Sequence, residues 1–101
     1  MVGPLALASI RELRFDTVVL GCCGLSDGRV TAHDLGDAAI KQAMIGSSAR
    51  VILAADGSKF RQTAMAVVCD AASVDMVVTD TDAPADDVDG LRAAGIEVLC
   101  V

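Results

Sequence analysis

Four short, continuous apolar runs dominate the hydrophobic pattern of this chain. They cover residues 17–20, 51–54, 74–78 and 96–101 and consist largely of Val, Leu and Ile. A strand with one face in water alternates apolar and polar side chains, whereas a strand covered on both faces has a continuous apolar run. The pattern therefore predicts four strands of a parallel sheet. A shorter run at residues 66–69 is interpreted as a further edge strand.

Helical signals lie between these runs. Asp34 is a suitable N-cap for a helix over residues 35–47, and Asp37 lies in its first turn, where the helix dipole favours a carboxylate. The apolar stripe of this helix recurs at spacings of three and four, at Ile40, Ala43, Met44 and Ser47. The pattern predicts a helix that packs against the sheet.

Two further helices complete the pattern. Pro84 near the first helical position and Gly95 just past the end predict a helix over residues 84–94, with Asp82 near its N-cap. Residues 5–13 are predicted to form a helix before the first strand. Capping and the helix dipole account for most of the aspartates around residues 80–89, where the central Gly and closing Glu of a calcium loop are absent.

The order of these elements predicts an α/β fold. Strands that alternate with helices imply right-handed βαβ crossovers with helices on both faces of a parallel sheet, a three-layer α/β/α arrangement. A chain of 101 residues has room for one domain, residues 1–101. Since such folds normally open with a strand and this one opens with a helix, we expect it to be incomplete at the N-terminus.

Composition and charge exclude two classes of function. No apolar run approaches the roughly 20 residues that a membrane-spanning helix needs, and residues 1–4 have no basic start of a secretory signal. The formal charge is −6, without the clusters of cations that grip a nucleic-acid backbone. The chain is therefore expected to be cytoplasmic, without membrane contact or direct binding to DNA.

The four cysteines are interpreted as small buried hydrophobes in a reducing compartment: Cys22, Cys23, Cys69 and Cys100. Their spacing lacks a C-x-x-C pair, and His33 is the single histidine, so neither a metal nor a cofactor is predicted. A Cys–His enzyme built from Cys22 or Cys23 with His33 remains an alternative.

Segments that follow the predicted strands carry the candidate chemistry, because ligands of open α/β sheets bind at the carboxyl ends of the strands. Gly21 to Gly24 follow the first strand, and Asp56 to Lys59 follow the second. Glycines allow close approach of backbone N–H groups, and a lysine adds a point charge, so the two segments resemble the parts of an anion cradle. The alternatives are ordinary turns, a solvated Lys59, and a helix-surface ion pair between Asp37 and Lys41.

Five ordered motifs resemble the DeoR family of sugar-responsive bacterial transcriptional regulators. The segment 15–25 resembles the family's first strand and turn, and residues 28–31 its Gly-x-Thr turn. The helix that contains Asp37, Lys41 and Met44 resembles the acidic-Ala-x-x-Lys-x-x-Met helix, and residues 55–60 match the Ala-Asp-x-Ser-Lys-Phe element. Residues 74–80 and 91–98 resemble the last strands and the helix that joins them, so the resemblance covers almost the whole chain.

The resemblance implies a sensor of phosphorylated sugars with a fold like ribose-5-phosphate isomerase and CoA transferases. The family's DNA-binding helix-turn-helix has no counterpart in this sequence, so the chain is expected to be the C-terminal half of an effector-binding domain. Its ligand-binding residues would be Gly21, Cys23, Gly24, Lys41, Asp56 and Lys59. We expect a homo-oligomer without catalytic residues; the alternative is an isomerase-like or CoA-transferase-like enzyme fragment.

Two of these residues depart from the family pattern. Many members carry Asp or Asn where this chain has Cys23, and a thiol is a weak hydrogen-bond partner for sugar hydroxyls. The resemblance places Lys41 where related isomerases use a carboxylate. A lysine there removes a general base and adds a cation for binding.

Overall fold

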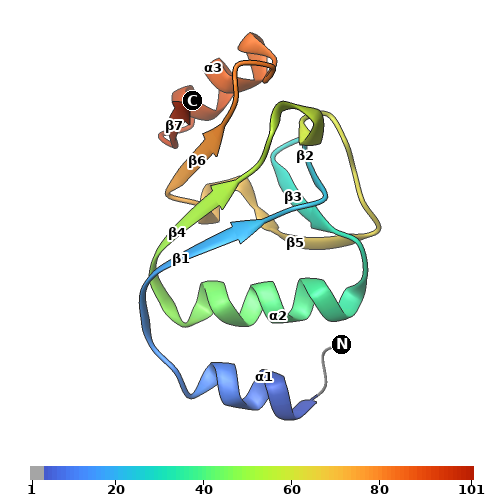
Figure 1. Cartoon of the computed structure of the whole chain (residues 1–101), viewed down its shortest axis with the longest axis vertical. Coiled ribbons are helices and arrows are strands. Elements are labelled where there is room, and N and C mark those ends of the chain that lie inside the picture. The colour runs from blue at the N-terminus through green and yellow to red at the C-terminus, as the bar shows by residue number, and fades with distance from the viewer. Residues whose placement is uncertain (1–3) are drawn as a thin grey trace.

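The computed structural model describes residues 4–101, which form two sheets and three helices (Figure 1). Residues 1–3, which include most of the segment inspected for a secretory signal, lie outside the described residues. The helices are α1 (Pro4–Arg11), α2 (Leu35–Gly46) and α3 (Ala85–Ala93). The strands are β1 (Phe15–Gly21), β2 (Gly24–Ser26), β3 (Arg29–Ala32), β4 (Ser48–Ala54), β5 (Ala66–Asp70), β6 (Met76–Thr79) and β7 (Glu97–Cys100).

The four long apolar runs form one parallel sheet in the order β1-β4-β6-β7. All three pairings are parallel, and in the first of them Val18 lies beside Val51 and Leu20 beside Leu53. The predicted α/β class with a parallel sheet is therefore confirmed. The predicted strand 74–78 begins two residues later, at Met76, because the backbone at residues 71–73 forms a short 3-10 turn.

One face of this sheet is covered and the other is not. Val18, Leu53, Val77 and Val98 point to the covered face and are at most 7% exposed. Val19 and Leu99 point to the opposite face and are 62% and 49% exposed. The strands follow one another across the sheet in chain order, so right-handed crossovers put every connection on the same side. The helices expected on both faces therefore cover one face within residues 4–101.

A second, antiparallel sheet was not predicted. It has the order β2-β3-β5, and the strand expected at residues 66–69 is an edge strand of this sheet, not of the parallel one. Strands β2 and β3 form a hairpin whose turn is Asp27–Gly28, with φ of 53° and 74°. Positive φ at both central residues gives the turn that suits the right-handed twist of a hairpin.

Helix α2 lies against both sheets, and α1 packs on its outer side (Figure 1). The N-cap of α2 is Asp34, as predicted, and its carboxylate accepts the Asp37 N–H at 2.7 Å. Helix α3 contacts β7 and ends before Gly95, whose φ of 88° confirms the predicted C-terminal stop. Its N-cap is Pro84, two residues after Asp82, whose backbone N–H donates to the Asp80 carboxylate.

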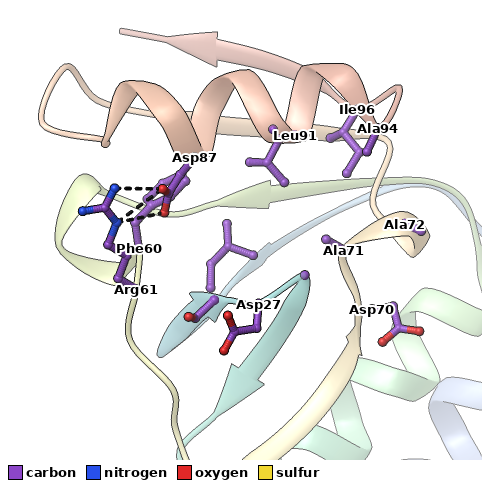
Figure 2. A pocket seen from close by; sticks show the side chains of 14 residues that line it. Asp27, Phe60, Arg61, Asp70, Ala71, Ala72, Asp87, Leu91, Ala94 and Ile96 are labelled. Carbon is purple, nitrogen blue, oxygen red and sulfur yellow. Dashed lines mark hydrogen bonds and ion pairs between the residues drawn. The ribbon is translucent and has the colours of Figure 1, made fainter.

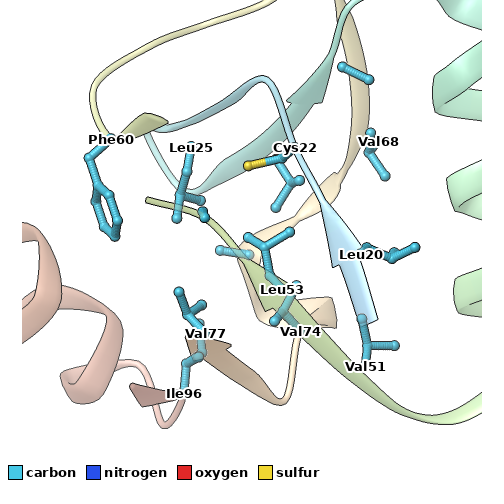
Figure 3. Close-up of a cluster of buried hydrophobic side chains, with 14 of the residues drawn as sticks. Leu20, Cys22, Leu25, Val51, Leu53, Phe60, Val68, Val74, Val77 and Ile96 are labelled. Atoms are coloured by element: carbon cyan, nitrogen blue, oxygen red, sulfur yellow. The ribbon is translucent and has the colours of Figure 1, made fainter. Parts of the chain in front are cut away.

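The core lies between the two sheets and includes Leu53, Leu25 and Val68 from three different strands (Figure 3). The ring of Phe60 joins it from the loop after β4 and is 4% exposed. Phe60 anchors this loop in the core, and the adjacent residues Lys59 and Arg61 therefore have defined positions. Within residues 4–101, no helix combines the length and apolar character needed to cross a bilayer.

The cysteines differ in burial more than the sequence predicted. Cys22 is buried, Cys23 and Cys69 are half-buried, and Cys100 is exposed on the edge strand β7. The interpretation of all four as buried hydrophobes was wrong for Cys100, which is the last residue of the edge strand β7 and is exposed although it lies on the same face as Val98.

This difference predicts the order of thiol labelling in the native chain. We expect a maleimide to modify Cys100 first and Cys22 last, because burial raises the pKa of the Cys22 thiol and lowers its thiolate fraction. Burial also raises the pKa of Cys69. Mass spectrometry of peptides after short labelling times measures the order; equal rates at all four sites would contradict the fold described here.

Candidate functional site

The loops that follow β4 and β6 meet at the carboxyl edge of the parallel sheet. The Asp80 carboxylate accepts the backbone N–H of Gly57 at 3.0 Å and that of Asp82 at 2.9 Å. A Cβ atom at Gly57 would lie 2.7 Å from the Ala83 backbone nitrogen. The loop after β4 thus packs directly on the loop that leads into α3, and only glycine fits at this point.

A short 3-10 turn, Gly57–Lys59, sets the direction of Lys59. Asp56 is its N-cap, and the carboxylate accepts both the backbone N–H and the hydroxyl of Ser58. The hydroxyl hydrogen bond lowers the pKa of the Asp56 carboxyl, with smaller contributions from the backbone N–H of Ser58 and the charge of Lys59. Asp56 therefore shapes the loop through its Oδ1 atom, which accepts both hydrogen bonds from Ser58.

Beside this turn is a cleft of about 460 Å³ that contains two of the predicted site residues, Cys23 and Lys59. The remaining lining residues are His33, Gln62, Thr63, Ala64 and Met65. Cys23 belongs to the turn after β1 and His33 to the segment before α2. The other lining residues belong to the segment between β4 and β5. No carboxylate belongs to this lining, although the chain as a whole carries a charge of −6. The cleft is therefore suited to an anion.

Lys59 provides the positive charge of the cleft. Its residue is half-buried, and within residues 4–101 its ammonium group has no ion pair or hydrogen bond with a protein acceptor. The ammonium group is therefore available to make charge-assisted hydrogen bonds to an anionic ligand.

Lys41 differs from Lys59. Its ammonium group lies 3.0 Å from the Asp37 carboxylate, one helical turn earlier, and its side chain is only 16% exposed. The ion pair expected as an alternative is thus present. The charge of Lys41 nevertheless reaches this region, because it opposes the rise in the pKa of Cys22 more strongly than that of Lys59 does. Lys41 lies outside the lining of the cleft.

Two predicted glycines have different surroundings. Gly21 ends β1, is exposed, and has no heavy atom within 4 Å of where a Cβ would be, so a ligand could approach its backbone. Gly24 is buried, and a Cβ there would overlap the Gln62 backbone and lie 2.7 Å from the Thr31 hydroxyl. Gly24 therefore allows close packing of the protein on itself and does not face the cleft.

Thr31 holds the two walls of the cleft together and was not singled out as a site residue. Its backbone carbonyl accepts the Cys23 N–H at 3.0 Å. Its hydroxyl, on a residue that is 2% exposed, accepts the Ala64 N–H at 2.9 Å and donates to the Gly24 carbonyl. The sequence places Thr31 and Ala64 33 positions apart, so no local pattern could have found this link.

The cleft combines one unpaired cation with groups that can donate hydrogen bonds. His33, Gln62 and Thr63 are exposed and line the same space as Lys59, while Met65, 71% exposed, adds an apolar surface. Within the part of the chain that the structure describes, no group of three His, Cys, Asp or Glu residues could hold a metal ion. The arrangement is suited to a small anion with hydroxyl groups.

A larger cavity, of about 570 Å³, lies elsewhere, between α3 and the β2–β3 turn (Figure 2). Its walls are mainly apolar and include Leu25, Phe60, Leu91 and Ile96. Its one basic residue, Arg61, is already paired with Asp87. Despite its size, this cavity offers an anion no free positive charge.

Comparisons with known proteins agree on one family. A family model described as the DeoR C terminal sensor domain matches residues 1–81. The chain is 33% identical over 100 residues to "Putative aga operon transcriptional repressor" of Escherichia coli O157:H7, and 35% identical over 85 residues to the glycerol-3-phosphate regulon repressor of Escherichia coli K12. It is 28% identical over 100 residues to the HTH-type transcriptional regulator GlpR of Haloferax volcanii.

These alignments cover 98%, 83% and 98% of this chain, respectively. They cover only 37%, 34% and 39% of the three relatives. The chain thus spans little more than a third of the length of the curated relatives that it matches.

Proposed function

Because this chain belongs to the DeoR C-terminal sensor domain family, we propose that its cleft binds a phosphorylated sugar or sugar alcohol as the signal of a transcriptional regulator. The relatives named above are a repressor of an aga operon, a repressor of a glycerol-3-phosphate regulon and a helix-turn-helix regulator. In the whole protein, the ligand would shift the population towards a state that binds DNA poorly.

The observation that carries this proposal is the unpaired Lys59 ammonium group in a cleft without carboxylates. A phosphate group supplies the missing negative charge, and a charge-assisted hydrogen bond is stronger than a neutral one. The ligand's hydroxyl groups would lie near Gln62 and Thr63, and its carbon chain near Met65.

A pair of matched ligands tests the proposal. We expect glycerol 3-phosphate to raise the melting temperature of the chain in a concentration-dependent way, because a ligand that binds only the folded state stabilises it. Glycerol, which has the same hydroxyl groups without the charge, should have no effect at the same millimolar concentrations. Equal responses to the two would count against recognition of phosphate.

An isomerase-like activity has less support than binding. The carboxylate base that the resemblance implies for related isomerases has no counterpart in the cleft lining, and the Lys41 ammonium group pairs with Asp37. The relatives are transcriptional regulators by name. Conversion of ribose 5-phosphate to ribulose 5-phosphate, lost in a Lys41→Ala variant, would favour the enzyme instead.

We also propose that the chain self-associates through the uncovered face of the parallel sheet. Val19 and Leu99 are exposed on that face, and among residues 4–101 β1 is an edge strand of the sheet. We expect light scattering at micromolar concentration to give a mass above 10.3 kDa, and a Val19→Lys variant to shift towards monomer. A wild-type chain that is monomeric under these conditions would refute the self-association.

Two further features belong to the whole protein. Contact with DNA would be made through a helix-turn-helix module outside this chain, which agrees with its charge of −6. A sensor of metabolic phosphates would work in the cytoplasm, where such compounds occur. We propose no membrane partner.

A further inference from the structure

Arg61 and Asp87 form an ion pair that joins the cleft segment to helix α3 (Figure 2). The Asp87 Oδ1 atom accepts from the Arg61 Nη2 at 3.1 Å and from Nε at 3.3 Å. Within residues 4–101, it is the single ion pair that connects α3 to another part of the chain. Two donors on one carboxylate fix the direction of the guanidinium as well as its distance.

The backbone of Arg61 has an uncommon conformation. Its φ is 63°, in the left-handed region that a residue with a long side chain rarely adopts. Such a conformation persists only where the surroundings hold it. Here the Arg61 N–H donates to the Leu25 carbonyl at 2.9 Å, and its side chain is held by Asp87.

The turn at Arg61 divides four consecutive residues between two spaces. Lys59 and Gln62 line the cleft, whereas Phe60 and Arg61 line the larger cavity beside α3. A relaxed, extended backbone at Arg61 would change the direction of the chain between Lys59 and Gln62. The two cleft residues would then no longer lie on the same side.

We propose that Asp87 is a positioning residue of the cleft: by holding Arg61 it keeps Lys59 and Gln62 directed at the bound anion. This inference rests on the proposed binding of a phosphorylated ligand at Lys59. The Arg61–Asp87 pair would thus couple α3 to ligand binding, because any movement of α3 that breaks the pair would also change the affinity of the cleft for the anion. By reciprocity, an anion in the cleft would favour the α3 position seen here.

Two matched variants on α3 test the proposal. Asp87→Asn breaks the ion pair, and Asp89→Asn makes the same change in charge at an exposed residue of the same helix without an ion pair. Calorimetric titration with glycerol 3-phosphate should show binding weakened roughly threefold or more in Asp87→Asn, a loss typical of an ion pair. Binding by Asp89→Asn should be unchanged. The double swap Arg61→Asp with Asp87→Arg should restore most of the affinity.

A second readout does not depend on the ligand. In ¹⁵N spectra of the free chain, Asp87→Asn should move the amide signals of Lys59 and Gln62, and Asp89→Asn should leave them in place. If the wild-type chain binds no phosphorylated ligand, the proposed function fails, and these signals alone decide the positioning role. Unmoved signals, or equal affinities of the two variants, would overturn it.

Discussion

Replacement of Lys59 by alanine is expected to remove most of the affinity of this chain for phosphorylated ligands. Lys59 is a half-buried residue that lines the cleft, and its ammonium group has no hydrogen bond or ion pair among residues 4–101. A hydrogen bond to a charged group contributes about 1.5–3 kcal/mol, which corresponds to a loss of roughly 10- to 150-fold in affinity. Isothermal titration with glycerol 3-phosphate measures this loss.

The other lysine of the chain serves as a comparison. Lys41 is paired with Asp37 and lies outside the cleft lining, so Lys41→Ala should weaken binding much less than Lys59→Ala. Lys59→Arg keeps the charge and should retain part of the affinity. If the two alanine variants lose affinity equally, both lysines contact the ligand, as the resemblance to the family implies. If neither loses any, the site lies elsewhere.

Replacement of Gly57 by alanine is expected to destabilise the fold and distort the cleft together. The added Cβ would lie 2.5 Å from the carbonyl carbon of Asp82 and 2.7 Å from the nitrogen of Ala83, and both are backbone atoms that cannot turn away. Overpacking of this kind costs about 1–3 kcal/mol of folding free energy. In a domain of this size, each kcal/mol lowers the melting temperature by about 4–8 °C. Calorimetry or circular dichroism measures the shift.

Gly21→Ala is the matched control for this variant. A Cβ at Gly21 would meet no heavy atom within 4 Å, so its melting temperature should stay close to that of the wild type. Gly21 was predicted to face the ligand, and a stable Gly21→Ala variant with weaker binding would support that role. A Gly57→Ala variant as stable as Gly21→Ala would contradict the close packing of the two loops.

The parallel sheet could be predicted because its signal is local. Each of the four long apolar runs indicates a buried strand from its own residues alone. The caps at Asp34 and Gly95 likewise mark the helix ends from nearby residues. The antiparallel sheet was missed although Asp27–Gly28 is a strong hairpin signal. Strands β2 and β3 have only three and four residues, and such short runs do not stand out beside longer ones.

The candidate site was predictable in part for a related reason. Cys23 and Lys59 follow strands of the same parallel sheet, so their approach follows from topology. Three other features depend on partners that are distant in sequence: the close fit of Gly24 on Gln62, the link from Thr31 to Ala64, and the pair of Arg61 with Asp87. Contacts between residues 26 to 38 positions apart leave no local pattern to read.

The most direct test of a phosphate-binding cleft is a titration of the ¹⁵N-labelled chain with glycerol 3-phosphate, followed by its amide signals. Signals of the cleft residues should move together with a single dissociation constant; these residues are Cys23, Lys59, Gln62 and Thr63. Signals of the exposed Leu99 on β7 and of α1 should stay in place. If the cleft signals do not move at millimolar ligand, or if only signals around the cavity beside α3 do, the cleft is not the site of recognition.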